Sequence, residues 1–208
     1  MVLSKKEVEI LISRLQGFEK PKIKLEQYET LSDLAAYIVY KAVDDIYNKR
    51  VIDLGCGTGI LSFVSYLFGS SFVLGVDIDL SAIKTARENK LFLEKTLNLK
   101  LDVNFIVCDV NNYCSKKRFD VCVMNPPFGV QKKFADRIFL KKAFEISDVI
   151  WTIFNYSSEP FVKKFSQENG FSVSHIESIE IPTRAKYPFH KSRIKRIPAD
   201  LYRIERLN

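Results

Sequence analysis

The sequence predicts an α/β fold with a doubly wound, mainly parallel sheet that is covered by helices on both faces. The first reason is that short apolar runs rich in β-branched residues alternate along the chain with segments whose apolar residues recur at helical spacing. The second is the stretch VIDLGCGTGIL at residues 51–61, where an apolar run, three alternating glycines and the start of a helical pattern follow one another. Strand–turn–helix units of this kind build parallel sheets.

The composition is that of one globular protein. A chain of 208 residues with 47% hydrophobic and 27% charged residues is long enough to bury a complete α/β core. It has no apolar run of membrane-spanning length and no signal-peptide core, so no membrane association is predicted. The cysteines form no C-x-x-C pair, so no metal site is predicted, and reduced thiols in core strands favour a cytoplasmic protein.

The N-terminal part is predicted to form two helices joined by an arm. The SKKE sequence at residues 4–7 has the capping-box pattern and begins a helix that is expected to end at Gly17. Residues 18–30 show no clear period and are expected to wrap over the domain as an extended arm. A second helix, capped at Ser32, is expected to run to Ile46 with its apolar face toward the core.

The rest of the chain is predicted to form the α/β core, so that residues 1–48 and 49–208 make one domain over 1–208. No internal repeat or interdomain linker interrupts it. The pattern predicts strands near residues 50–54, 72–76, 103–108, 119–124, 149–155, 171–181 and 200–206. It predicts helices between them near residues 59–68, 81–95, 138–147 and 159–169.

Polar side chains stand at the ends of four predicted strands. They are Asp53, Asp77, Asp109 and Asn125. Because ligands of doubly wound sheets bind outside the carboxyl ends of the strands, we expect these four side chains to share one site.

The glycine motif indicates the class of ligand. Gly55, Gly57 and Gly59 let the turn adopt unusual dihedral angles and let a ligand lie against bare backbone. The spacing is G-x-G-x-G instead of the dinucleotide pattern G-x-G-x-x-G, and Asp53 would repel a phosphate. S-adenosylmethionine, which has an ammonium and a sulfonium and no phosphate, fits this motif. An ordinary strand-to-helix turn is the alternative.

Two further acids fit the same cofactor. Asp77 can accept hydrogen bonds from both ribose hydroxyls. Its alternative role, capping the next helix, is already filled by Asp79. Asp109 can accept a hydrogen bond from the adenine amino group, or it can be only a turn residue.

The sequence Asn125-Pro126-Pro127-Phe128 fits methyl transfer to a planar amino group. Such a nitrogen is a poor nucleophile because its lone pair is delocalised. The Asn125 side-chain oxygen and the Pro126 carbonyl can accept its two N–H bonds, and proline offers no competing donor. Phe128 offers a flat face for stacking, as base-modifying enzymes provide for a flipped nucleotide. A proline-rich turn without chemistry is the alternative.

The excess of basic residues is localised near the C-terminus. Lys and Arg outnumber Asp and Glu by 32 to 25, giving a net charge of +7. Nearly all of this surplus lies in a predicted loop over residues 182–199, which holds Arg184, Lys186, His190, Lys191, Arg193, Lys195 and Arg196 and no acid before residue 200. With Tyr187 and Phe189 interleaved, the loop favours contact with RNA, whereas a solvated charge run is the alternative.

These motifs resemble a family of class I S-adenosylmethionine-dependent methyltransferases. It comprises the small methyltransferase-like proteins that methylate N6 of an adenine in small-subunit ribosomal RNA, and the archaeal members are the most similar. The resemblance covers almost the whole chain, and its segments beyond the glycine motif are FEKPKIKLEQYET (18–30), GVDID (75–79), CDV (108–110), MNPPFG (124–129), ADRIFL (135–140) and FHK (189–191).

The resemblance implies a Rossmann-like, seven-stranded sheet with an antiparallel last strand, preceded by an N-terminal helical arm. Carried over residue by residue, it implies cofactor contacts at Gln27, Thr30, Gly55, Thr58, Ile60, Asp77, Asp109 and Val110. The target adenine would be held by the segment from Asn125 to Phe128. Thr58 stands where human-type members have cysteine, and the loop after NPPFG is of the shorter archaeal type.

The resemblance also raises the question of a partner. Eukaryotic members work with a small zinc-binding activator protein. In the implied fold the third strand is an exposed edge, where Leu101, Val103, Phe105 and Val107 alternate, and pairing with a partner strand there is expected.

Two other functions stay open on the sequence. The same acceptor geometry suits the side-chain amide of a protein glutamine, although enzymes of that kind usually carry tyrosine where Phe128 stands. A non-catalytic RNA-binding module is the other possibility, and the intact glycines, Asp77 and NPPF sequence argue against it. The sequence therefore favours an RNA adenine-N6 methyltransferase.

Overall fold

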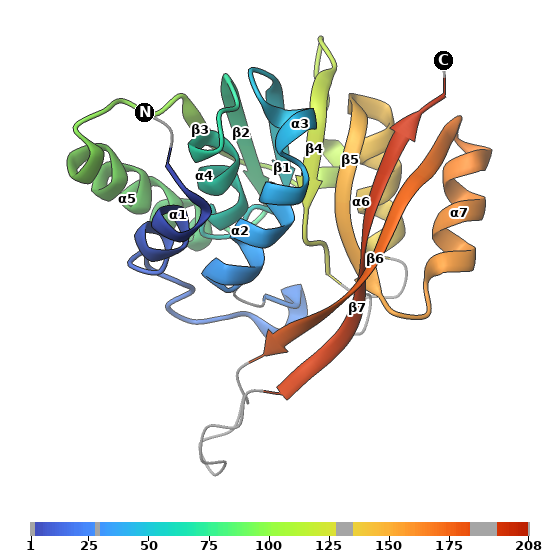
Figure 1. Cartoon of the computed structure of the whole chain (residues 1–208), viewed down its shortest axis with the longest axis horizontal. Coiled ribbons are helices and arrows are strands. Elements are labelled where there is room, and N and C mark those ends of the chain that lie inside the picture. Colours follow the sequence, from blue (N-terminus) through green and yellow to red (C-terminus); the bar gives the residue numbers. More distant parts are fainter. Residues whose placement is uncertain (1–2, 28–29, 128–134, 184–194, 208) are drawn as a thin grey trace.

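The computed structural model describes residues 3–27, 30–127, 135–183 and 195–207, and a seven-stranded sheet lies at its centre (Figure 1). The strand order is β3-β2-β1-β4-β5-β7-β6. The strands are β1 Arg50–Leu54, β2 Phe72–Asp77, β3 Val103–Val107, β4 Phe119–Met124, β5 Ser147–Asn155, β6 Phe171–Thr183 and β7 Lys195–Arg206. Strands β1 to β5 pair in parallel, and β7 is antiparallel to both β5 and β6. The predicted fold class is therefore confirmed.

Helices cover both faces of this sheet. They are α1 Lys5–Ile12, α2 Ser32–Lys41, α3 Val43–Ile46, α4 Ile60–Leu67, α5 Leu80–Leu97, α6 Ala135–Ile146 and α7 Glu159–Glu168, with 3₁₀ turns η1 Ile23–Leu25 and η2 Val110–Asn112. Successive residues of β1 face opposite cores: Val51 packs with α1, α2, α4 and α5, whereas Ile52 packs with α6 and α7. This alternation is why apolar residues follow one another in the central strands, although Asp53 interrupts the run in β1.

Two predicted helix ends differ from the structure. The capping box at Ser4 is present, but α1 ends at Ile12, well before Gly17. Leu31, which makes no side-chain cap, precedes α2, so Ser32 is its first residue instead of its cap.

The helix that the sequence predicts from Ser32 to Ile46 is broken at Ala42 into α2 and α3. The Ala42 N–H donates to the carbonyls of both Ile38 and Val39 and so tightens the last turn of α2.

The predicted basic loop was too long at both ends. Strand β6 continues to Thr183 and β7 already begins at Lys195, so only residues 184–194 lie between them. Strand β7 pairs with β5 only from Ala199 onward, and residues 195–198 form a two-stranded ribbon with β6 alone. In this ribbon the exposed Arg196 and Pro198 alternate with the partly buried Ile197, and charged side chains are tolerated at the exposed positions, which is why this run of charges resembled a loop.

Strand β3 lies at the edge of the sheet, as expected, but its apolar residues do not form a free surface. Leu101, Val103 and Phe105 are buried in the protein's own core, and the Phe105 ring packs edge-on against Phe63 at 5.4 Å. Of the four alternating residues only Val107 is exposed. A partner would therefore meet the strand's backbone edge and not this row of side chains.

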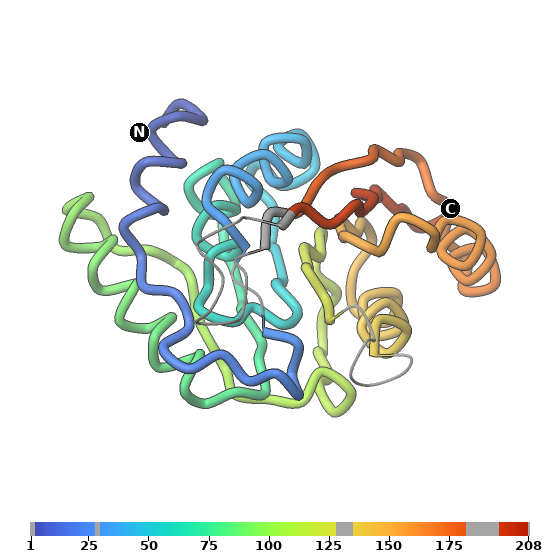
Figure 2. Tube along the Cα trace, turned by 90° about the horizontal axis from the view of Figure 1, so that it is seen from below, coloured from blue at the N-terminus to red at the C-terminus, as the bar shows by residue number. Residues whose placement is uncertain are grey.

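The N-terminal arm crosses the carboxyl edge of the parallel strands. Figure 2 looks onto this edge and shows the segment between α1 and α2 running across it. Gln16 ties the start of this segment to α5, because its N–H donates to Asn89 Oδ1 at 2.8 Å and its carbonyl accepts from Asn89 Nδ2 at 2.9 Å. Among the described residues, no helix combines the length and apolar character needed to cross a membrane.

Candidate active site

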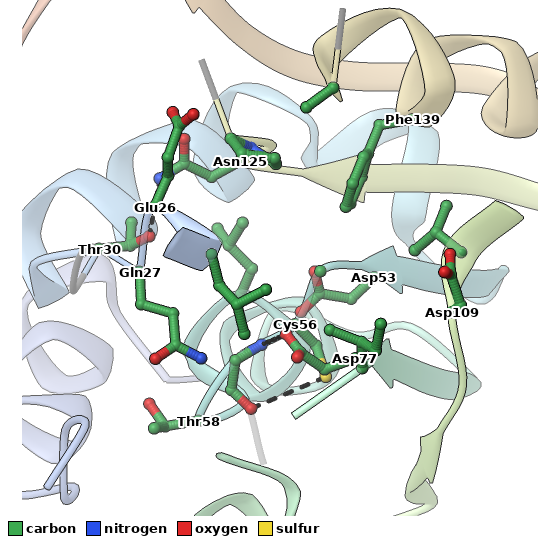
Figure 3. Close-up of a pocket in the computed structure, with 18 of the residues that line it drawn as sticks. Glu26, Gln27, Thr30, Asp53, Cys56, Thr58, Asp77, Asp109, Asn125 and Phe139 are labelled. Atoms are coloured by element: carbon green, nitrogen blue, oxygen red, sulfur yellow. Dashed lines mark hydrogen bonds between the residues drawn. The ribbon is translucent and has the colours of Figure 1, made fainter. Parts of the chain in front are cut away.

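A pocket opens where the arm meets the carboxyl ends of the parallel strands (Figure 3). The predicted cofactor residues that line it are Gln27, Thr30, Asp53, Gly55, Gly57, Thr58, Ile60, Asp77, Asp109 and Val110. Of the predicted acceptor residues, Asn125 and Pro127 line the same pocket. Pro126 is buried beside it and Phe128 lies outside the described residues. The fold thus brings together residues that are up to 100 positions apart in the sequence.

The glycine turn is held between two strands so that its backbone faces the pocket. The N–H groups of Gly55 and Cys56 both donate to the Val76 carbonyl of β2, at 2.8 and 3.1 Å. Gly57 has a φ of +52°, which favours glycine, and a Cβ there would lie 2.7 Å from Phe18 Cζ. Gly59 does not line the pocket, and its bare Cα instead makes room for the aromatic rings of the core.

Asp53 is a buried acid with one uncompensated oxygen. Its Oδ2 accepts a 2.6 Å hydrogen bond from Ser62 Oγ, whereas Oδ1 has no partner among the described residues. Burial raises the pKa of Asp53 to about 7, and the nearby Asp77 carboxylate adds to the effect. A buried carboxylate with a free oxygen at the wall of a pocket fits a cationic ligand group.

Asp77 ends β2 with its carboxylate at the pocket wall. Its Oδ2 accepts from the Gly57 N–H and its Oδ1 from the Asp79 N–H, both at 2.8 Å. Each oxygen keeps a second lone pair, so the side chain fits two adjacent hydroxyl groups. Burial raises the pKa of Asp77 above its usual value, although these two backbone hydrogen bonds oppose the shift. Asp79 caps α5 by accepting from the Ser81 N–H.

Asp109 is a turn residue that also lines the pocket, and its contact with the adenine amino group stays a prediction. Its Oδ1 accepts a 2.8 Å hydrogen bond from the Asn111 N–H and so caps η2. Asp109 also lines the pocket, next to the buried Val110. Asp109 lies across the pocket from Gln27 and Thr30 of the arm (Figure 3).

Asn125 directly follows β4 and faces the arm. Its Nδ2 donates to Thr30 Oγ1 at 3.0 Å, which directs the other end of the carboxamide, the acceptor Oδ1, away from Thr30. Asn125 is partly buried and shares the pocket with the glycine turn. An acceptor oxygen here can bind a planar amino group.

Most of the predicted RNA contacts lie outside the described residues. These are Arg184, Lys186, His190, Lys191 and Arg193. Lys195 and Arg196 begin β7, at the end of the ribbon that projects beyond β5 (Figure 1). The Arg196 guanidinium pairs with Glu180 Oε2 of β6 at 2.8 Å, and both side chains are exposed.

Two aromatic residues of the pocket were not predicted from the sequence. Phe18 comes from the arm and lies over Gly57, and Phe139 comes from α6 and lies over Gly55. Figure 3 shows the Phe139 ring entering the pocket between Asn125 and Asp109. Their segments resemble those of the family, but only the register of the arm and of α6 against the sheet brings these two rings to the glycines.

Comparisons with known proteins agree with this architecture. Residues 29–146 match the family described as methyltransferase small domain. An uncharacterized protein of Methanocaldococcus jannaschii, MJ0284, is 42% identical over 99% of this chain and 96% of its own length. The rRNA N(6)-adenosine-methyltransferase METTL5 of Danio rerio is 32% identical over 95% of this chain and 97% of its own. The crystal structure of PH1948 from Pyrococcus horikoshii superposes with a TM-score of 0.87 at 39% identity, over 100% of both chains.

Proposed function

The chain belongs to the methyltransferase small domain family, and from this premise we propose that it methylates N6 of an adenine in ribosomal RNA, most specifically small-subunit RNA. The observation that carries the proposal is that Asn125 and Pro127 line the same pocket as the glycine turn and Asp77. A methyl donor and an amino acceptor can therefore meet there. The activity in the name of the Danio rerio relative supports RNA as the substrate.

The donor subsite fits S-adenosylmethionine, which supplies an electrophilic methyl group on a sulfonium. The free Oδ1 of Asp53 suits a cationic group of this cofactor, because a buried carboxylate is stabilised by a nearby positive charge. Asp77 accepts hydrogen bonds from ribose hydroxyls, and the glycine turn leaves its backbone bare for close approach. Asp109 and Val110 border the adenine end.

The acceptor subsite works by position and not by a titrating base. Asn125 Oδ1 and the Pro126 carbonyl accept the two N–H bonds of the adenine amino group, and Phe128 stacks on the base. These acceptors favour a pyramidal nitrogen whose lone pair points at the methyl group. As the bond from nitrogen to the methyl group forms, the methyl–sulfur bond would break with S-adenosylhomocysteine as the leaving group, and the extra proton on the then strongly acidic nitrogen would pass to water. Asn125→Ala should therefore abolish methyl transfer and leave cofactor affinity nearly unchanged.

The function is tested by incubating the protein with tritiated S-adenosylmethionine and total ribosomal RNA. The RNA is taken from cells that lack this protein, so that its target adenine is unmethylated. Nucleoside analysis should find the label in N6-methyladenosine and, after fractionation, in small-subunit RNA. Label only in protein would instead support glutamine methylation, and RNA binding without any transfer would support the non-catalytic module. Asn125→Ala is the control for contaminating enzymes.

The basic segment, from Arg184 to Arg196, is proposed to hold the RNA beside the pocket. Replacing Lys195 and Arg196 by glutamine should weaken binding and reduce the slope of log K against log salt by about two. The matched control replaces Lys163 and Lys164, two exposed lysines of α7 that do not line the pocket. Equal salt slopes in the two variants would show that the segment is only a solvated surface.

A small zinc-binding activator protein is proposed to pair with the outer edge of β3. The edge position leaves one side of this strand's backbone without a partner strand in the described sheet. Adding such an activator should slow hydrogen exchange at residues 103–107 more than at the core strand β4. Unchanged hydrogen exchange along β3 would contradict pairing with this partner.

We expect the protein to act in the cytoplasm.

A further inference from the structure

We propose that Thr30 is a positioning residue for the acceptor step. By accepting a hydrogen bond from Asn125 Nδ2, it holds the carboxamide with Oδ1 toward the incoming amino group. This inference rests on the proposed function and deepens it, because it assigns the arm to the acceptor and not only to the cofactor.

The two ends of a carboxamide differ in hydrogen bonding. One end accepts hydrogen bonds and the other donates them, and a half-turn about χ2 exchanges the two. An amino group that presents two N–H bonds needs the oxygen, and meeting the NH2 end would place donor against donor. The 3.0 Å contact gives one N–H donor of the Asn125 NH2 end an acceptor at Thr30, and this hydrogen bond favours the productive orientation.

The position of Thr30 is itself fixed by the neighbouring part of the arm. Gln27 Nε2 donates to Asp79 Oδ2 at 2.8 Å, and Lys22 Nζ binds Asp79 Oδ1 at 2.7 Å. The Lys22 N–H donates to Gln27 Oε1 at 2.7 Å and closes the loop between them. Asp79 is nearly fully buried, so these contacts hold the arm against the end of β2.

The arm therefore connects the two subsites. Asp79 gives its backbone N–H to Asp77 Oδ1, at the ribose position, while accepting from Gln27 of the arm. Three residues later Thr30 reaches Asn125 at the end of β4, and Figure 3 shows Gln27, Thr30 and Asn125 along one side of the pocket. Docking of the arm thus sets the orientation of the acceptor side chain.

The test separates the hydroxyl of Thr30 from its bulk. Thr30→Val keeps the shape and removes the acceptor, and we expect kcat to fall about ten- to a hundred-fold, as for the loss of one hydrogen bond to a half-buried amide. The dissociation constant of S-adenosylmethionine, from calorimetry, should change less than about threefold. Thr30→Ser restores the hydroxyl and should recover most of the rate. Thr85→Val, at an exposed site on α5, is the matched control.

Two further measurements distinguish positioning from a structural role. In the Asn125→Asp background both side-chain ends are oxygens, so adding Thr30→Val should lower the residual kcat much less than it does in the wild type. In nuclear magnetic resonance spectra, the Asn125 side-chain NH2 signals, identified by their loss in Asn125→Asp, should shift in Thr30→Val and return in Thr30→Ser.

Three results would overturn the assignment. They are a serine variant as slow as the valine variant, a loss of cofactor affinity equal to the loss in kcat, or unshifted Asn125 signals. The proposed function fails separately, because the nature of the labelled product is decided with the wild-type protein. Should that product be a glutamine amide, the same variants still test the orientation of Asn125.

Discussion

The raised pKa of Asp53, the buried acid just before the glycine turn, predicts how the stability of the protein and its binding of the cofactor depend on pH. The pKa of Asp53 is raised from 3.8 to about 7, chiefly by burial. A shift of about three pH units corresponds to about 4 kcal/mol, so the ionised form destabilises the cofactor-free fold by roughly that amount. Asp53→Asn removes this ionisation with little change in shape.

Whether stability rises or falls with pH depends on which state, folded or unfolded, binds more protons at Asp53. Between about pH 4 and pH 7 the folded state holds the Asp53 proton while the unfolded state has lost it. The contribution of Asp53 to stability is therefore full below pH 4, falls as the pH rises to about 7 and is constant above that. Relative to Asp53→Asn, the cofactor-free wild type should lose about 4 kcal/mol of unfolding free energy from pH 4 to pH 8, as measured with urea.

Binding of the cationic cofactor should reverse this effect. A positive charge beside Asp53 favours the carboxylate, so binding near pH 7 should release about half a proton. Calorimetry in buffers of different ionisation enthalpy measures this number, which should fall toward zero above pH 8.5. Ser62→Ala removes the hydrogen bond that lowers the pKa of Asp53, and it should move the release to higher pH. Equal proton release at pH 7 by wild type and Asp53→Asn would contradict the raised pKa of Asp53.

Three other substitutions test the glycine turn, a second glycine outside the pocket and an ion pair. Gly57→Ala needs both a φ of +52° and the displacement of Phe18, 2.7 Å away, so it should weaken cofactor binding more than about tenfold. Gly170→Ala has φ +79° but no atom within 4 Å, so it should cost about 1 kcal/mol of stability and leave binding unchanged. Asp45→Ala removes the carboxylate that accepts from Arg203 at 2.8 Å, far from the pocket. It should lower the unfolding free energy by about 2 kcal/mol without changing kcat.

Burial explains which strands could be predicted. Strands β1 and β4 have the predicted bounds, because both their faces are covered and their apolar runs stop where the pocket begins. Strand β7 was predicted to start at Asp200 but starts at Lys195. Its first residues pair only with β6, and of residues 196–198 only Ile197 is partly buried, so no apolar pattern marks them as strand.

The same reasoning applies to the site. Asp53, Asp77, Asp109 and Asn125 were found because the fold class alone places the ends of parallel strands on one edge. That rule requires no knowledge of side-chain packing. It gives the strand-end residues of the pocket, whereas Phe139 depends on how α6 is rotated against the sheet.

Local sequence patterns could not predict the contacts of the arm, because these contacts join residues that lie far apart in the sequence. Thr30 meets Asn125 across 95 positions, and the resemblance to the family implied only that Thr30 approaches the cofactor. Residues 18–30 show no period, and three of their side chains contact different elements: Phe18 the glycine turn, Gln27 the start of α5 and Thr30 the end of β4. An aperiodic segment whose side chains contact the glycine turn at one end and the end of a strand at the other is therefore better interpreted as part of a site than as a linker. We propose that in this protein it joins the donor and acceptor subsites.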